Sequence, residues 1–135
     1  MDDGILDVLE LRERLSDDQI RTLVHDFYAR IQAEPVLGPI FASRIAQDAW
    51  PAHLDRMERF WSTILRGSRS YLGNPMAAHD PLRALGVDAE HFGRWLRLFR
   101  EVAAESLPEV IVNSILQRAE RMAERLLASM QIAGS

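Results

Sequence analysis

Apolar residues recur three or four positions apart along most of this 135-residue chain, and this period constrains its fold more than any other feature. It predicts amphipathic helices throughout and requires no strand. The first apolar stripe consists of Ile20, Leu23, Val24, Phe27 and Ile31. Ser16 and Gln19 form a predicted capping box before this stripe, and Glu34 followed by Pro35 ends it. Tyr28 lies at the edge of the stripe, so it faces a core with its hydroxyl near the boundary.

Three further long helices follow from the same period. One covers residues 49–66, where Pro51 is tolerated in the first turn and Gly67 acts as the stop. Asp88 caps the next helix, and a Leu-Pro pair ends it. The last helix covers residues 109–130.

Shorter elements are predicted between these helices and at the amino terminus. Residues 37–41 predict a connecting turn or a single helical turn. His79 lies in a short segment that begins at Pro75 and that Pro81 limits to scarcely two turns. Residues 5–14 predict a short helix ahead of the main pattern.

The composition is that of a single soluble globular domain. Apolar residues make up 47% and charged residues 27%, which excludes a disordered chain. The formal net charge is -4, so the chain has no basic surplus for a nucleic-acid backbone or an anionic membrane, although all 16 of its Lys and Arg residues are arginine. The acidic amino terminus does not resemble a secretory signal, and no apolar run is long enough to span a membrane. We therefore expect a cytoplasmic protein without nucleic-acid or membrane partners.

The chain contains no cysteine, and this limits its metal chemistry. Disulfides, zinc knuckles, iron–sulfur clusters and covalent haem attachment of the c type are all excluded. Any metal must be held by histidine, carboxylate or tyrosine.

The four histidines, His25, His53, His79 and His91, match no metal site built from protein ligands alone. No two are four residues apart as in zincins, and the Glu-x-x-His motif of di-iron bundles does not occur. His53 and Asp55 cannot share an ion, because residues two apart on a helix point about 200° from each other. His25 and His91 are expected to face solvent. His53 lies in an apolar stripe, where a satisfied core histidine and a ligand are both open interpretations, and the sequence around His79 favours neither.

A haem site would use several of these residues. A haem requires a neutral imidazole on one face and a largely apolar pocket with polar groups on the other. His79 suits the first role, and Tyr28, His53 and Trp95 suit the second. The alternative is that Tyr28 and Trp95 are core aromatics with incidental hydrogen bonds.

Six motifs in a fixed order between residues 20 and 132 together resemble a known family. They are Phe27-Tyr28, residues 37–41 (LGPIF), Trp50-Pro-Ala-His53 leading to Phe60-Trp61, residues 74–79 (NPMAAH), residues 90–99 (EHFGRWLRLF) and residues 115–119 (ILQRA). This order resembles the truncated haemoglobins, specifically their group III, which lacks the paired glycines of the other groups. The present chain also has no Gly-Gly pair.

The resemblance implies an all-α fold, the two-over-two helical sandwich of a truncated globin around a haem. The globin domain is expected to cover residues 16–132, preceded by an extension at residues 1–15 and followed by a frayed tail at residues 133–135. The role of the extension stays open.

The resemblance also implies roles for individual residues. His79 becomes the proximal iron ligand, and Tyr28 and Trp95 become the hydrogen-bonding pair around the bound gas. His53 takes the position of a distal gate, and Arg56 is placed to meet a haem propionate. The cofactor-contacting residues implied are Phe41, Arg56, Met57, Trp61, Met76 and Phe92. Met57 departs from the branched aliphatic residue that is common at its position, which leaves the volume of the pocket open.

The function implied is reversible binding of oxygen at the ferrous iron of one non-covalent haem b, with nitric oxide and carbon monoxide as further ligands. A reductase partner is unidentified. One alternative is an enzyme, a peroxidase or nitric-oxide dioxygenase in which His53 acts as acid or base. A more remote alternative is a haem-free helical interaction domain. The sequence alone does not choose between storage, detoxification, peroxide chemistry and signalling.

Overall fold

The computed structural model describes residues 6–67 and 87–134, apart from the side chains of residues 8 and 129–134. Every regular element in these two ranges is a helix, which confirms the all-helical prediction. In chain order the elements are α1 (Val8–Arg14), α2 (Asp17–Ala33), α3 (Leu37–Arg44), the 3-10 turn η1 (Gln47–Ala49), α4 (Trp50–Arg66), α6 (Ala89–Ser106) and α7 (Glu109–Gly134). None of the described helices is long and apolar enough to cross a membrane.

The helix ends form where local chemistry predicts them. The Ser16 hydroxyl accepts the N–H of Gln19 at 3.1 Å, and the Gln19 side chain accepts the N–H of Ser16 at 2.8 Å, as in the predicted capping box. Asp88 caps α6. Gly67 ends α4 with φ at 69°, a left-handed conformation that glycine adopts without a steric penalty.

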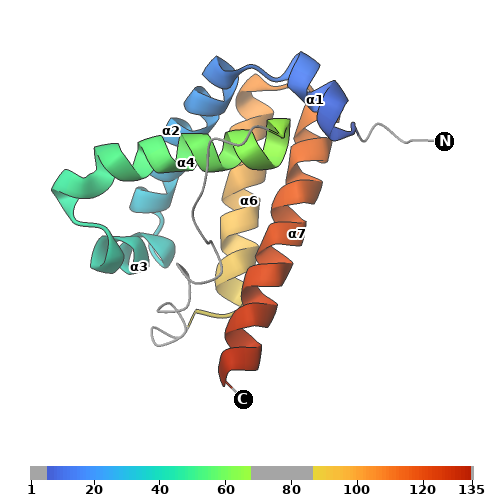
Figure 1. Ribbon diagram of the computed structural model, residues 1–135. Helices are drawn as coiled ribbons and strands as arrows, with labels where there is room; N and C mark the ends of the chain where they lie inside the picture. Colours follow the sequence, from blue (N-terminus) through green and yellow to red (C-terminus); the bar gives the residue numbers. More distant parts are fainter. Residues whose placement is uncertain (1–5, 68–86, 135) are drawn as a thin grey trace.

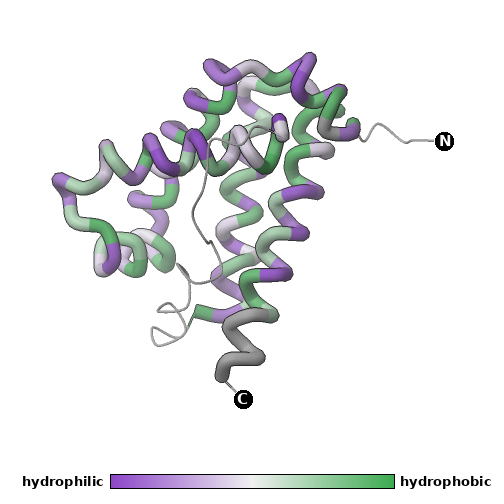
Figure 2. Tube along the Cα trace, in the orientation of Figure 1, coloured by the Kyte–Doolittle hydropathy of each residue, from purple (hydrophilic) through white to green (hydrophobic). Residues whose placement is uncertain are grey.

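Two pairs of helices build the fold (Figure 1). α6 and α7 lie side by side, and α4 crosses them while packing against α2. α2 also packs on α6 and on α3. Figure 2 shows that hydrophobic and hydrophilic residues alternate along each helix, so each helix buries one face. The result is the expected two-over-two arrangement.

Aromatic rings occupy the centre where α2, α4 and α6 meet. Phe27 lies edge-on to Trp95 and Phe99, with ring centroids 5.1 and 5.3 Å away. Trp95 stacks on Phe99 at 5.6 Å and on Trp61 at 5.8 Å. Phe27, Trp61 and Phe99 are each 1% exposed. Close packing therefore holds these three rings in place around Trp95.

The segment after α2 is more helical than predicted. The expected turn at residues 37–41 is the first part of α3, which continues to Arg44. The Glu34 carboxylate accepts the N–H groups of Val36 and Leu37 and so satisfies the start of this helix. A Cβ on Gly38 would lie 2.6 Å from the carbonyl oxygen of Gln32, so only glycine allows α3 to approach α2 this closely.

The described part of the amino-terminal extension, residues 6–15, packs onto the globular body. Leu6 donates its N–H to the buried hydroxyl of Ser114 on α7 at 2.7 Å. Arg12 donates from Nε to the carbonyl of Arg66 at 3.1 Å, at the end of α4. At the other end of the chain, α7 runs to Gly134, into the segment at residues 133–135 that was predicted to be frayed.

Candidate functional site

A cavity of about 340 Å³ opens between α3, α4, α6 and α7, within the size range of sites for small molecules and cofactors. Most of its lining is apolar, and no described lining residue is an Asp or Glu. The lining residues are Tyr28, Leu37, Ile40, Phe41, Arg44, Ile45, His53, Arg56, Met57, Phe60, Trp61, Val87, His91, Phe92, Trp95, Met122, Ala123 and Leu126.

Tyr28 places a phenol hydroxyl on this lining and is buried, at 4% exposure. It comes from α2, where its position at the edge of the apolar stripe turns it toward α4. Burial raises the pKa of Tyr28 well above the usual range of a phenol. The hydroxyl is therefore neutral at physiological pH and can donate a hydrogen bond.

His53 reaches the cavity from α4 and meets Tyr28 there. Their ring centroids are 5.5 Å apart, and the ring planes are nearly perpendicular at 89°. Trp50, at the start of α4, also contacts His53, with ring centroids 5.3 Å apart. The imidazole lies in the first turn of α4, where it is half-buried and contacts both aromatic rings.

Trp95 reaches the same cavity from α6. Its ring is parallel to Trp61, at an interplanar angle of 23°, and both tryptophans line the cavity. The structure therefore brings Tyr28, His53 and Trp95, which the sequence singled out on three separate helices, around one space. Their roles there stay predictions.

Five of the six residues predicted to contact a cofactor also line this cavity: Phe41, Arg56, Met57, Trp61 and Phe92. The sixth, Met76, and the predicted metal ligand His79 lie outside the described residues. Among the described residues, no group of three His, Asp or Glu side chains is arranged to hold a metal ion.

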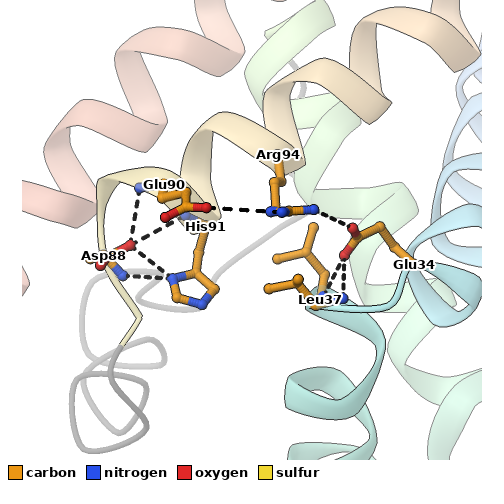
Figure 3. A network of polar contacts seen from close by, with 7 residues as sticks. Glu34, Leu37, Asp88, Glu90, His91 and Arg94 are labelled. Carbon is orange, nitrogen blue, oxygen red and sulfur yellow. Dashed lines mark hydrogen bonds and ion pairs between the residues drawn. The ribbon is translucent and has the colours of Figure 1, made fainter.

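The expectation for His91 is wrong. Its side chain is 22% exposed and lines the cavity, because it occupies the third position of α6 and turns back onto the cap. His91 Nδ1 lies 2.9 Å from Asp88 Oδ1 (Figure 3). This hydrogen bond, helped by two backbone N–H groups and opposed by desolvation, holds the pKa of Asp88 below its usual value. The capping-box spacing from Asp88 to His91 was the signal that could have shown this.

His25 is exposed as predicted, with 48% of its side chain accessible. It also forms a contact that the sequence did not reveal. Its Nε2 lies 2.8 Å from Glu58 Oε2, which connects α2 to α4 on the surface. His25 does not line the cavity.

The charged residues of the lining share one sign. Arg44 on α3 and Arg56 on α4 are both exposed and both line the cavity, and sequence reasoning found only Arg56. With apolar walls and two guanidinium groups, the cavity suits a large apolar molecule that carries negative charge at one edge.

Comparisons with known proteins agree with this description. The profile of the family described as bacterial-like globin matches residues 15–128. The chain is 33% identical over 113 residues to the group 3 truncated hemoglobin ctb of Campylobacter jejuni, covering 82% of this chain and 87% of that protein. The crystal structure of the group III truncated hemoglobin from Campylobacter jejuni superposes with a TM-score of 0.79 at 31% identity. This match covers 87% of the present chain and 93% of that one.

Proposed function

The chain belongs to the bacterial-like globin family, as a group III truncated haemoglobin, and from this premise we propose that it binds one non-covalent haem b and takes up oxygen reversibly. Membership of the family itself implies a haem cofactor and a diatomic gas ligand. The choice of haem b and of oxygen is our proposal.

The cavity lining is the observation that carries this proposal. Haem is a flat apolar macrocycle with two propionate groups, and the cavity has apolar and aromatic walls with Arg44 and Arg56 among its lining residues. No carboxylate among the described lining residues would repel the propionates. The residues present therefore fit the cofactor.

Several residues of this chain would hold the haem in the cavity. When bound, the haem supplies an iron atom with a coordination position for a diatomic gas. Arg44 and Arg56 would hold the propionates by charge-assisted hydrogen bonds, and the imidazole of His79 would hold the iron. Phe41 and Phe92 would contact the macrocycle.

On the gas side, the chain offers two hydrogen-bond donors and one imidazole. Tyr28 presents a hydroxyl that is neutral at physiological pH, as for any phenol, and burial raises its pKa further. Trp95 presents an indole N–H, which cannot act as an acceptor. His53 lies nearest the start of α4, and we assign it the control of gas access to the cavity.

The absorption spectrum of the purified protein tests the proposal. A Soret band that shifts on reduction and again on addition of carbon monoxide is expected, and its absence after addition of haem contradicts the assignment. Arg44→Glu combined with Arg56→Glu should weaken haem binding by placing negative charge beside the propionates. Arg97→Glu is a matched control, because Arg97 is exposed on α6 and does not line the cavity.

One observation favours a second candidate function. His53 lies inside the cavity beside Tyr28, where an imidazole can act as acid or base on a substrate such as peroxide. The protein would then be a haem peroxidase or nitric-oxide dioxygenase supplied with electrons by a reductase. Catalytic turnover with a reductant in the wild type, lost in His53→Leu, distinguishes this function from gas binding alone.

A further inference from the structure

We propose that Trp50 is a positioning residue that holds the His53 imidazole inside the cavity and so sets how often gas can pass it. The inference deepens the proposed function and rests on it, because it assumes that gas reaches the site past His53. It concerns a residue that does not itself line the cavity.

Three rings form a closed triangle at the start of α4. Trp50 lies 5.3 Å from His53 at 88°, and Tyr28 lies 5.5 Å from His53 at 89°. The third side is completed by Tyr28 and Trp50, whose centroids are 6.1 Å apart. His53 is therefore in edge-to-face contact with two neighbouring rings, the arrangement that aromatic rings prefer.

Both neighbours of His53 are fixed in place. Tyr28 is 4% exposed and Trp50 is 7% exposed, whereas His53 is only half-buried. Of the three rings, His53 is the one that can leave, and it must break both contacts to do so. Its swing toward solvent therefore costs the loss of both aromatic contacts, although His53 lies in the first turn of α4.

Trp50 is a better residue to change than Tyr28, because Trp50 contacts both rings but does not line the cavity. Tyr28 lines the cavity, so changing it also changes the groups that face the ligand. Trp50 occupies the first position of α4, one turn before His53, and contacts the imidazole from outside the cavity lining. Loss of the indole should release His53 and remove one contact of Tyr28, while every side chain of the lining is retained.

The test compares the wild type with Trp50→Leu and Trp50→Phe as purified haem-loaded proteins. The first readout is acylation of the His53 imidazole by diethylpyrocarbonate, measured by mass spectrometry relative to the exposed His25 in the same molecule. The second readout is the association rate of carbon monoxide after flash photolysis. Leu65→Ala is the matched control, because Leu65 is a fully buried α4 residue that does not line the cavity.

Trp50→Leu should raise both the acylation rate of His53 and the association rate roughly two- to tenfold, the range expected for loss of one aromatic contact. Trp50→Phe should restore most of the wild-type behaviour because it restores a ring. Adding Trp50→Leu to His53→Leu should change the association rate little. Leu65→Ala should lower stability without increasing the acylation of His53.

Several outcomes overturn the proposal. An unchanged acylation rate in folded Trp50→Leu does so, and so does an equal increase in Leu65→Ala. In the wild type alone, acylation of His53 as fast as that of His25 contradicts a held imidazole, so the proposal is testable even if Trp50→Leu does not fold. If no form of the protein takes up haem, the proposed function fails, while the acylation rates still decide whether Trp50 holds His53.

Discussion

Arg94 on α6 donates from Nη1 to Oε1 of Glu34 at 2.8 Å, and this ion pair joins α6 to the start of α3 (Figure 3). The other oxygen of Glu34 accepts the N–H groups of Val36 and Leu37. One carboxylate therefore caps α3 and ties it to the helix that carries Trp95. Since both helices line the cavity, the pair fixes two of its walls relative to each other.

Arg94→Gln should lower the free energy of unfolding by about 1–2 kcal/mol, because Glu34 loses a charged donor while its side chain remains only 13% exposed. Urea unfolding measures the change. Arg97→Gln, on an exposed position of the same helix, should change stability by less than about 0.5 kcal/mol. If a double-mutant cycle with Glu34→Gln gives no coupling energy, the pair does not contribute as we describe.

The contribution of Glu34 should disappear in acid. Desolvation opposes its ionisation, but hydrogen bonds from Leu37, Val36 and Arg94 outweigh this and hold the pKa of Glu34 below its usual value. A carboxyl whose pKa is lower in the folded state stabilises the fold fully above its unfolded pKa of about 4.3, and this stabilisation is lost as the pH falls toward the folded pKa. The difference in unfolding free energy between wild type and Glu34→Gln should thus shrink from pH 6 to pH 3. A difference that stays constant over this range contradicts the assignment.

His79→Ala should abolish stable haem retention or make it depend on added imidazole, which can replace the missing ligand. Haem transfer to an acceptor globin, followed by absorption, measures retention. His25→Ala is the control, because His25 is exposed and lies away from the cavity. An unchanged ferrous spectrum and haem affinity in His79→Ala would show that another residue is the axial ligand.

Tyr28→Phe and Trp95→Phe should each speed oxygen dissociation, because each removes a hydrogen-bond donor facing the ligand. A charge-assisted bond contributes about 1.5–3 kcal/mol, or roughly ten- to hundredfold in rate if it is wholly lost during escape. Carbon monoxide carries less charge and should respond less. Stopped-flow rates for both gases measure the contrast, and equal effects on the two gases would indicate a steric change instead.

The replacements of Tyr28 and Trp95 differ in what they remove besides the hydrogen-bond donor. Trp95 is stacked on Trp61 and Phe99, so its replacement also removes aromatic packing. Tyr28→Phe retains the ring and removes only the hydroxyl. The Tyr28 variant is therefore the cleaner measure of hydrogen bonding, and Trp95→Phe should additionally lower stability.

The sequence by itself determined the long helices and the ends of α2 and α4. The apolar period, the Ser16–Gln19 capping box and the stop at Gly67 are local features, and each depends on residues within about one turn of the chain. The same period placed Tyr28 and Trp95 on or beside buried faces. The sequence alone was therefore enough to identify both as candidate site residues.

Only the tertiary structure decided which of these residues meet and what surrounds them. Arg44 is a lining residue because α3 continues past its predicted turn to Arg44, and Glu34 at the start of α3 is held by Arg94 from a distant helix. The spacing from Asp88 to His91 is local, but the packing of the start of α6 beside the cavity is not, and this packing makes His91 a lining residue. Contacts between residues far apart in sequence depend on how whole helices pack, and the pattern within one helix does not specify that packing.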